Sequence, residues 1–466
     1  MTSAGVVTAA EAATVGMMAA VAATDRACAV SPLAREKTSS LNLRLMRTPK
    51  IVTTLKDYGW PLFRADLVAG LTVAMVALPL SIAIAIASGA SPAQGLVTAI
   101  VGGFFISLVG GSRVQIGGPT GAFIVVVFAV IAEHGYDGLV LATLMAGIIL
   151  LVAGYFRLGR FITFVPEAVV NGFTIGIALV IALSQLADLF GLTIADLPAD
   201  ALEKTQALWA ARETAQLGAL AVGIASLAAM VALRRLAPRF PGLIVAVIGG
   251  SVAALLLGLP VDTISSRFGD LPSSLPMPHL PDVSVARLQE LLPSALIIAF
   301  LAGVESLLSA MVADRMIGGS HRPNAELLAQ GTANVASALF GGLPATGAIA
   351  RTATNVKAGG RTPVAGLIHA LTVLAIMMLA APLAGYLAMP VLAAVLLFTA
   401  WNMAEPHRWG AYARLPAADR ALLVMTMLLT VLVDLTVAIG VGVCAGLLLR
   451  LRTRQTPPDD WTPPER

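Results

Sequence analysis

The sequence predicts an all-α polytopic membrane protein. Of its 466 residues, 58% are hydrophobic and only 12% are charged, whereas soluble domains carry about 25% charged residues. The mean hydropathy is +0.87, and apolar runs long enough to enter a bilayer recur along most of the chain. The 43 glycines indicate that the helices pack closely through small residues.

Motifs of enzymatic or nucleotide-driven chemistry are missing from the sequence. It has no nucleotide-binding P-loop, no nucleophile elbow and no metal-ligand cluster. Cys28 lies in a tail and Cys444 in an apolar segment, so they support neither a disulfide framework nor a metal site. The net charge of +4 does not indicate nucleic acid, because the basic residues lie in short loops. We therefore expect no enzyme, no cofactor and no nucleic-acid partner.

Hydrophobic patterning predicts fourteen apolar segments, with boundaries good to a few residues. In chain order they are 66–88, 94–111, 118–133, 138–156, 166–187, 212–233, 241–258, 292–313, 326–341, 346–357, 362–380, 384–400, 420–433 and 435–450. The third and the tenth follow Gly/Pro motifs and are too short for a full span of about 20 residues. We expect these two to be half-helices.

The charges of the loops predict the orientation of the chain. Loops after even-numbered segments are basic, as at Arg113, Arg234 and Arg361, whereas loops after odd-numbered segments are acidic, as at Asp188 and Asp262. Basic loops face the cytoplasm. An even number of segments then returns both termini to the cytoplasmic side of a bacterial-type inner (plasma) membrane.

A Pro/Ser-rich loop divides the segments into two sets of seven. Seven is an odd number, so the second set enters the membrane from the opposite side and the two sets form inverted repeats. The predicted organisation is a disordered tail and cytoplasmic lead-in at 1–65, a first repeat at 66–258, an extracytoplasmic loop at 259–291, a second repeat at 292–450 and a cytoplasmic tail at 451–466.

The stretch 341–361, GGLPATGAIARTATNVKAGGR, places Arg351 inside an apolar membrane protein, where an unpaired charge is costly. Pro344 and Thr346 predict a helix start, with Arg351 in the second turn. A half-helix that starts near mid-membrane would direct its unpaired N–H groups and this guanidinium at one small volume, which would attract an anion. Alternatively, Arg351 lies at a cytoplasmic helix end and reaches the lipid headgroups.

A second motif favours the first alternative. Residues 115–125, QIGGPTGAFIV, carry GGPTGA where the later stretch carries GGLPATGA. Interrupted helices at matching places in two halves indicate a transporter's substrate site. Chance similarity is the competing explanation, since Gly/Pro clusters are common in loops. If the motifs are a true repeat, Thr120 and Thr346 are expected to flank the anion.

These residues resemble the SulP anion transporters, the sulfate-permease or solute-carrier-26 family. The matching stretches are PLSIAIAIASGASPAQGL (79–96), VQIGGPTGAFIVVV (114–127), VPEAVVNGFTIGIALVIALSQLADLFGL (165–192) and a long run at 304–370 that includes both VESLLSAMVADRM and GGLPATGAIARTATNVKAGGR. The last stretch looks most like the bicarbonate-transporter branch. The likeness covers roughly residues 60–450.

The resemblance implies a fold, a movement and a set of site residues. Segments 1–4 and 8–11 would form a core domain and the others a gate domain that often dimerises, with elevator-like movement between them. By motif match, the implied substrate residues are Leu80, Ser81, Ile84, Gly118, Pro119, Thr120, Gly121, Ala348, Ala350 and Arg351, and the implied cation-coupling residues are Glu305 and Ser309.

Two departures from the family pattern limit how far the family's properties can be assigned to this chain. Many members have a glutamine where Leu80 stands, so one hydrogen bond to substrate is in doubt. Most members also carry a cytoplasmic STAS domain after the last span, and no such domain fits in 451–466. Either a short member or a truncated chain would account for this.

Glu305 is the second charge expected within the membrane, with Ser309 on its face of the helix. The resemblance allows sodium at this position, while desolvation of a carboxyl would also allow a proton. The alternative is a static ion pair between Glu305 and Arg351. The lone His369, in an apolar segment, is expected to be a satisfied core residue.

Together these features predict a homodimeric secondary active transporter of small anions, namely bicarbonate, sulfate or a dicarboxylate, coupled to H+ or Na+ by symport. The alternatives are a nucleobase permease of the same fold, an uncoupled anion channel and a non-transporting scaffold. Arg351 argues against the permease, because a neutral ring calls for carboxylates instead.

Overall fold

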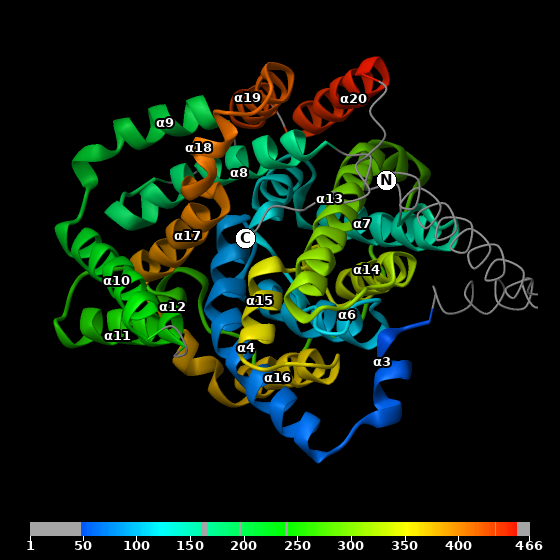
Figure 1. Ribbon diagram of the computed structural model, residues 1–466. Helices are drawn as coiled ribbons and strands as arrows, with labels where there is room; N and C mark the ends of the chain where they lie inside the picture. Colours follow the sequence, from blue (N-terminus) through cyan, green and yellow to red (C-terminus); the bar gives the residue numbers. More distant parts are fainter. Residues whose placement is uncertain are drawn as a thin grey trace, which may run out of the picture. The chain divides into compact units, whose positions relative to one another are not determined.

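The computed structural model describes residues 48–159, 166–194, 197–198, 200–237, 241–433 and 435–453. Nearly all of the regular structure is helical (Figure 1). Most of the predicted N-terminal tail and most of the predicted C-terminal tail lie outside these residues.

A helix covers most of each of the fourteen predicted segments. The first half contains α3 (Lys50–Thr54), α4 (Trp60–Ala87), α5 (Pro92–Val97), α6 (Gly103–Val109), α7 (Ile124–Tyr155), α8 (Glu167–Phe190), α9 (Ala201–Ala210), α10 (Leu217–Leu236), α11 (Gly242–Leu256) and α12 (Ile264–Phe268). The second half contains α13 (Val285–Ile317), α14 (Pro323–Leu339), α15 (Ile349–Lys357), α16 (Val364–Ala384), α17 (Met389–Ala404), α18 (Trp409–Tyr412), α19 (Ala417–Leu432) and α20 (Leu435–Thr453).

Within the described residues, eight helical runs are long and apolar enough to cross a membrane. Three of them join shorter elements, and Met389–Tyr412 is one, since it combines α17, a 3₁₀ turn at Pro406–Arg408 and α18; the other two lie in the first half. Pro92–Val109 continues α5 into α6 through a π-helical turn at Thr98–Gly102, and Gly121–Tyr155 joins a 3₁₀ turn at Gly121–Phe123 to α7. The latter run contains both the third and the fourth predicted segments. They are separated by a break at Gly135, where φ is 71° and ψ is 177°.

The only strands in the described part of the chain are two residues long and join the two Gly/Pro motifs. β1 (Gly117–Gly118) pairs antiparallel with β2 (Thr346–Gly347). This pairing corrects the predicted helix start at Thr346. The backbone at 346–347 is extended by the pairing, so α15 begins at Ile349 with Ala348 as its N-cap residue, and Arg351 lies in the first turn and not the second.

Helices from the two halves of the chain pack against each other. α7 contacts α13 and α14, while α4 contacts α15 and α16; α15 and α16 lie beside α4 in Figure 1. A second group is centred on α8, which contacts α17 and α19, and α10 packs on α17 and α11. The residues that the sequence implicated in binding lie mostly in the first group.

Candidate functional site

The strand pair brings the starts of the two predicted half-helices together. Gly117 is opposite Gly347, and Gly118 is opposite Thr346. Two further bonds extend the pair: the N–H of Ala348 donates to the carbonyl of Ile116 at 2.8 Å, and the N–H of Ile116 donates to Thr352 Oγ1 at 3.0 Å. The 3₁₀ turn at Gly121 and α15 at Ile349 therefore start within a few residues of a shared junction.

Arg351 is buried at this junction with few partners. Its side chain is 1% exposed, and Nη2 donates to Ser81 Oγ on α4 at 3.1 Å. Nε and Nη1 have no hydrogen-bond partner among the described residues. Burying a charge without full hydrogen bonding is costly, so the unused N–H groups favour an anionic ligand.

The first motif places Gly118 beside Arg351, at a position where only glycine fits. Its φ of +147° is one that L side chains rarely adopt, and a Cβ at this position would overlap Nη1 of Arg351. Absence of a side chain therefore lets the backbone of β1 pass directly against the guanidinium.

Glu305 connects the site to α13. The hydroxyl of Thr120 donates to Glu305 Oε2 at 2.9 Å, and the charge of Glu305 attracts that of Arg351. Ser309, one turn further along α13, is fully buried and donates to Thr352 Oγ1 at 3.3 Å. In this structure Ser309 braces α13 against α15.

The other predicted residues are placed as follows. Leu80 and Ile84 are buried on α4 on either side of Ser81, and Pro119 is buried after β1. A Cβ at Gly121 would lie 3.1 Å from Met403 Sδ and 3.5 Å from Ile181 Cδ1, so this residue faces α17 and α8. Ala348, the N-cap residue of α15, is buried, but Ala350 in its first turn is exposed.

The hydroxyl of Thr346 is engaged with α13. It lies 2.6 Å from Ser306 Oγ and 3.2 Å from the carbonyl of Ala302. That Thr120 and Thr346 flank an anion stays a prediction, and in this structure Thr346 uses its hydroxyl to hold β2 against α13.

His369 differs from its expected role. It is fully buried on α16, but neither ring nitrogen has a hydrogen-bond partner among the described residues. The prediction of a satisfied core histidine is therefore wrong. The apolar segment offers the ring a buried position without offering it an acceptor or donor.

Two buried carboxylates support the site, and sequence analysis gave them no role. Glu326 on α14 accepts hydrogen bonds from the N–H groups of Gly111 at 2.9 Å and Ser112 at 3.2 Å, in the turn that leads to β1. Asp66 on α4 accepts from the N–H groups of Arg361 at 2.9 Å and Thr362 at 3.1 Å, between α15 and α16. The available signal was a carboxylate at the first position of two apolar segments.

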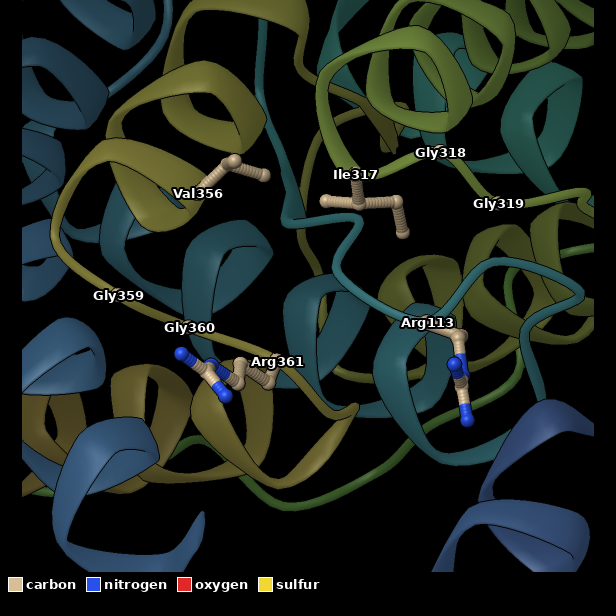
Figure 2. Close-up of a pocket in the computed structure, with 8 residues that line it drawn as sticks. All are labelled: Arg113, Ile317, Gly318, Gly319, Val356, Gly359, Gly360 and Arg361. Atoms are coloured by element: carbon tan, nitrogen blue, oxygen red, sulfur yellow. The ribbon is translucent and has the colours of Figure 1, made fainter.

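A separate cavity of about 410 Å³ lies at the far end of α15. Figure 2 shows its lining residues, which come from the end of α13, the end of α15 and the turn before β1: Arg113, Ile317, Gly318, Gly319, Val356, Gly359, Gly360 and Arg361. None of them belongs to the predicted site. The Arg351 junction and this cavity are thus distinct features at opposite ends of α15.

Metal binding has little support in the described part of the chain, which contains no group of three or more His, Cys, Asp or Glu side chains arranged to hold an ion. Glu305 with Thr120 provides only one carboxylate and one hydroxyl. Any cation there would need further oxygen ligands from backbone or water.

Comparison with known proteins identifies the family. The sulfate permease family matches residues 63–426. The putative sulfate transporter YvdB of Bacillus subtilis is 41% identical over 396 residues, which is 84% of this chain and 74% of YvdB. The bicarbonate transporter BicA of Picosynechococcus is 32% identical over 401 residues, covering 83% of this chain and 70% of BicA.

Solved structures agree with this assignment. The transmembrane domain of a cyanobacterial BicA superposes with a TM-score of 0.72 at 30% identity, over 84% of this chain and 98% of that domain. SLC26A9 gives a TM-score of 0.79 at 19% identity, over 90% of this chain and 70% of that one, which supports the fold alone. The matched relatives are transporters and not enzymes. The chain is a membrane protein of the sulfate permease family.

Proposed function

We propose that the chain is a secondary active transporter of small anions and that Arg351 binds the substrate. The observation that carries this proposal is a guanidinium that is 1% exposed and has two nitrogens without a partner among the described residues. It lies where two helix starts from opposite halves of the chain meet. Helix starts present unpaired N–H groups, which add to the attraction for an oxyanion.

The substrate class follows from this chemistry. A planar guanidinium and backbone N–H groups suit a carboxylate, a bicarbonate or a sulfate. The names of the relatives point to sulfate and bicarbonate. Leu80 contributes only apolar contact, so Arg351 and the helix starts are the polar groups that we assign to the anion. Ser81 holds Arg351 beside it, because its hydroxyl accepts from Nη2 and donates to the carbonyl of Ala77 at 2.7 Å.

Alternating access would occur by movement of one helix group against the other. Ser81 lies on α4, Glu305 on α13 and Arg351 on α15. Thr120 precedes the 3₁₀ turn that leads into α7, and these helices pack together. The group around α8, α10, α17 and α19 faces them, for example where Ile181 approaches Gly121. We propose that the first group carries the anion across the membrane as an elevator, while the second stays fixed and forms a homodimer.

Glu305 is our proposed coupling residue, for H+ or Na+. Its bond from Thr120 links it to the start of the first half-helix, and its charge acts on Arg351. An anion at Arg351 and a cation at Glu305 would then stabilise each other, which is the requirement for symport.

Uptake into proteoliposomes tests the substrate and the mechanism together. Labelled bicarbonate, sulfate, fumarate and uracil would each be supplied with and without imposed proton and sodium gradients. We expect saturable, gradient-dependent accumulation of at least one anion and none of uracil. Uracil uptake would favour the nucleobase permease, and anion flux that no gradient drives uphill would favour a channel.

A further inference from the structure

A buried lysine lies outside the site described so far. Lys204 is on α9, the short helix between α8 and α10, which sequence analysis places on the extracytoplasmic side. Ala201, Lys204 and Leu208 form the buried face of this helix, so the lysine occupies a position where helical periodicity would place an apolar residue. Its side chain is 3% exposed.

The ammonium group has less polar contact than its charge requires. Nζ donates to Ser184 Oγ on α8 at 3.1 Å and lies 5.3 Å from the centre of the Phe128 ring on α7. An ammonium has three donors, and Ser184 is its one hydrogen-bond acceptor among the described residues. The aromatic ring compensates only in part.

No acidic side chain in the described ranges forms an ion pair with Lys204. Burial lowers the pKa of Lys204, and the charge of Asp200 opposes that effect. The Asp200 carboxylate, however, caps α9 by accepting from the N–H groups of Leu202 and Glu203. Glu203 itself is exposed. The lysine would therefore gain from an additional anionic partner.

Lys204 also lies at one end of the interface between α7 and α8, which we call the seam. The other end of this seam is at the proposed substrate site. At the inner end, Gly121 faces Ile181 where the first half-helix meets α8. Ser184 is three residues beyond Ile181, about 4.5 Å along the helix, and Phe128 is seven residues beyond Gly121, about two turns. The contacts of Lys204 with both residues close this seam between α7 and α8.

We propose that Lys204, with Ser184 and Phe128, forms a second anion-binding station on the α9 side of the protein, which binds the transported oxyanion on its way to or from Arg351. The station rests on the proposed transport function. When the two helix groups move apart along the seam, the ammonium leaves the Phe128 ring and binds the anion in its place.

Transport from one side at a time tests the station. Lys204→Met removes the charge and keeps the apolar stem, Lys204→Arg keeps the charge, and Arg212→Met is the control because it removes an exposed charge from the same connecting segment. Initial rates of sulfate and bicarbonate transport would be measured in vesicles of known orientation. For anion supplied on the α9 side, we expect Lys204→Met to raise KM about tenfold, the loss expected for one charge-assisted hydrogen bond.

For anion supplied on the opposite side, KM of Lys204→Met should stay near the wild-type value. Lys204→Arg should stay within about threefold on both sides, and Arg212→Met should match the wild type. A residue that only packs α9 would change thermal stability without a sided change in KM. If Lys204→Met changed KM by the same factor on both sides, relative to the wild type, the station would be overturned.

A binding measurement separates failure of the station from failure of the transport proposal. Arg351→Ala protein in detergent should keep a weak stabilisation by millimolar sulfate, and addition of Lys204→Met should remove it. Loss of this stabilisation in the double variant would support the station even if no uptake were seen. An unchanged stabilisation would overturn it, whatever the wild-type protein transports.

Discussion

Arg351 is held where burial penalises its charge, and in the described part of the chain one hydroxyl, that of Ser81, accepts a hydrogen bond from it. Such a group is stable only if the surrounding fold fixes it or a ligand completes its hydrogen bonds. The Gly118 backbone and Ser81 fix its position, and Glu305 supplies a long-range counter-charge. A bound oxyanion would recover part of the desolvation cost, which is the physical basis of the proposed binding.

Arg351→Ala should abolish uptake and the high-affinity component of anion binding, because it removes the one full positive charge assigned to the junction. Arg351→Lys should restore uptake only in part, since an ammonium lacks the planar fork that suits oxyanions. Lys357→Ala is the matched control, as it removes an exposed charge from the end of the same helix. Wild-type affinity in purified Arg351→Ala would remove this residue from the site.

Ser81→Ala should raise KM by roughly tenfold to a hundredfold, the effect of losing one hydrogen bond to a charged group. Without Ser81 Oγ, Nη2 of Arg351 loses its acceptor on α4. Ser88→Ala is the control: Ser88 is also buried, at the C-cap of this helix, and within the described residues its hydroxyl donates to the carbonyl of Ile84 and not to a neighbouring helix. Concentration-dependent uptake measures both. Equal KM values in the two variants would mean that Ser81 does not position Arg351.

Individual residues differ in how well the sequence predicts their environment in the fold. Arg351 was predictable because a charge stands out in an apolar run. Glu326 and Asp66 were not, because their partners lie 215 and 295 residues away in the chain. For His369, the sequence showed an apolar helix and gave no sign that both ring nitrogens would lack partners among the described residues.

The junction of the two half-helices depends on a structural element that sequence patterns cannot show. β1 and β2 are two residues each, too short for the alternation of polar and apolar residues that identifies a strand. The sequence predicted that Thr120 and Thr346 of the two motifs flank one anion, and the structure adds that backbone pairing joins the motifs. Extension of the backbone at Thr346–Gly347 is also why α15 starts three residues later than predicted.

The turn before β1 is held by Glu326, so this carboxylate should stabilise the junction from behind. Glu326→Ala leaves the N–H groups of Gly111 and Ser112 without their acceptor and should cost about 2–4 kcal/mol in the free energy of unfolding. Glu326→Gln keeps one acceptor oxygen and should cost about half as much.

Thermal unfolding in detergent checks these values. Glu290→Ala serves as the control, because Glu290 forms an exposed pair with His134 and exposed pairs contribute about 0–1 kcal/mol. A Glu326→Ala protein as stable as this control would show that the turn does not depend on the carboxylate.

For the whole molecule, the apolar runs of the sequence predicted the helical membrane class and the positions of the helices. They succeeded because each helix must bury its own backbone polar groups in the bilayer, which makes long apolar runs unavoidable. The sequence was a poorer guide to which helices pack against each other. α14 packs on α7 and α16 on α4, and each of these pairs joins helices from opposite halves of the chain, which hydropathy along the sequence does not connect.

Coupling is a property of the whole molecule, because it links ion binding at one residue to the movement of a helix group. Glu305→Gln keeps the shape of the side chain and removes its charge. If H+ or Na+ is carried at Glu305, the variant should lose gradient-driven accumulation but keep slow anion exchange, since Arg351 still attracts the substrate. If Glu305 serves only as a structural partner of Arg351, the variant should be less stable and its residual uptake should keep the wild-type ion dependence.

Uptake under separate proton and sodium gradients, beside thermal unfolding of the same preparations, decides between these outcomes. Glu290→Gln is the matched control, because it removes an exposed carboxylate from the same helix, α13, and should accumulate anion like the wild type. The gradient whose effect disappears in Glu305→Gln identifies the coupling ion. Accumulation by Glu305→Gln at the wild-type level under both gradients would exclude Glu305 as the coupling site, because no charge would then remain there to bind either cation.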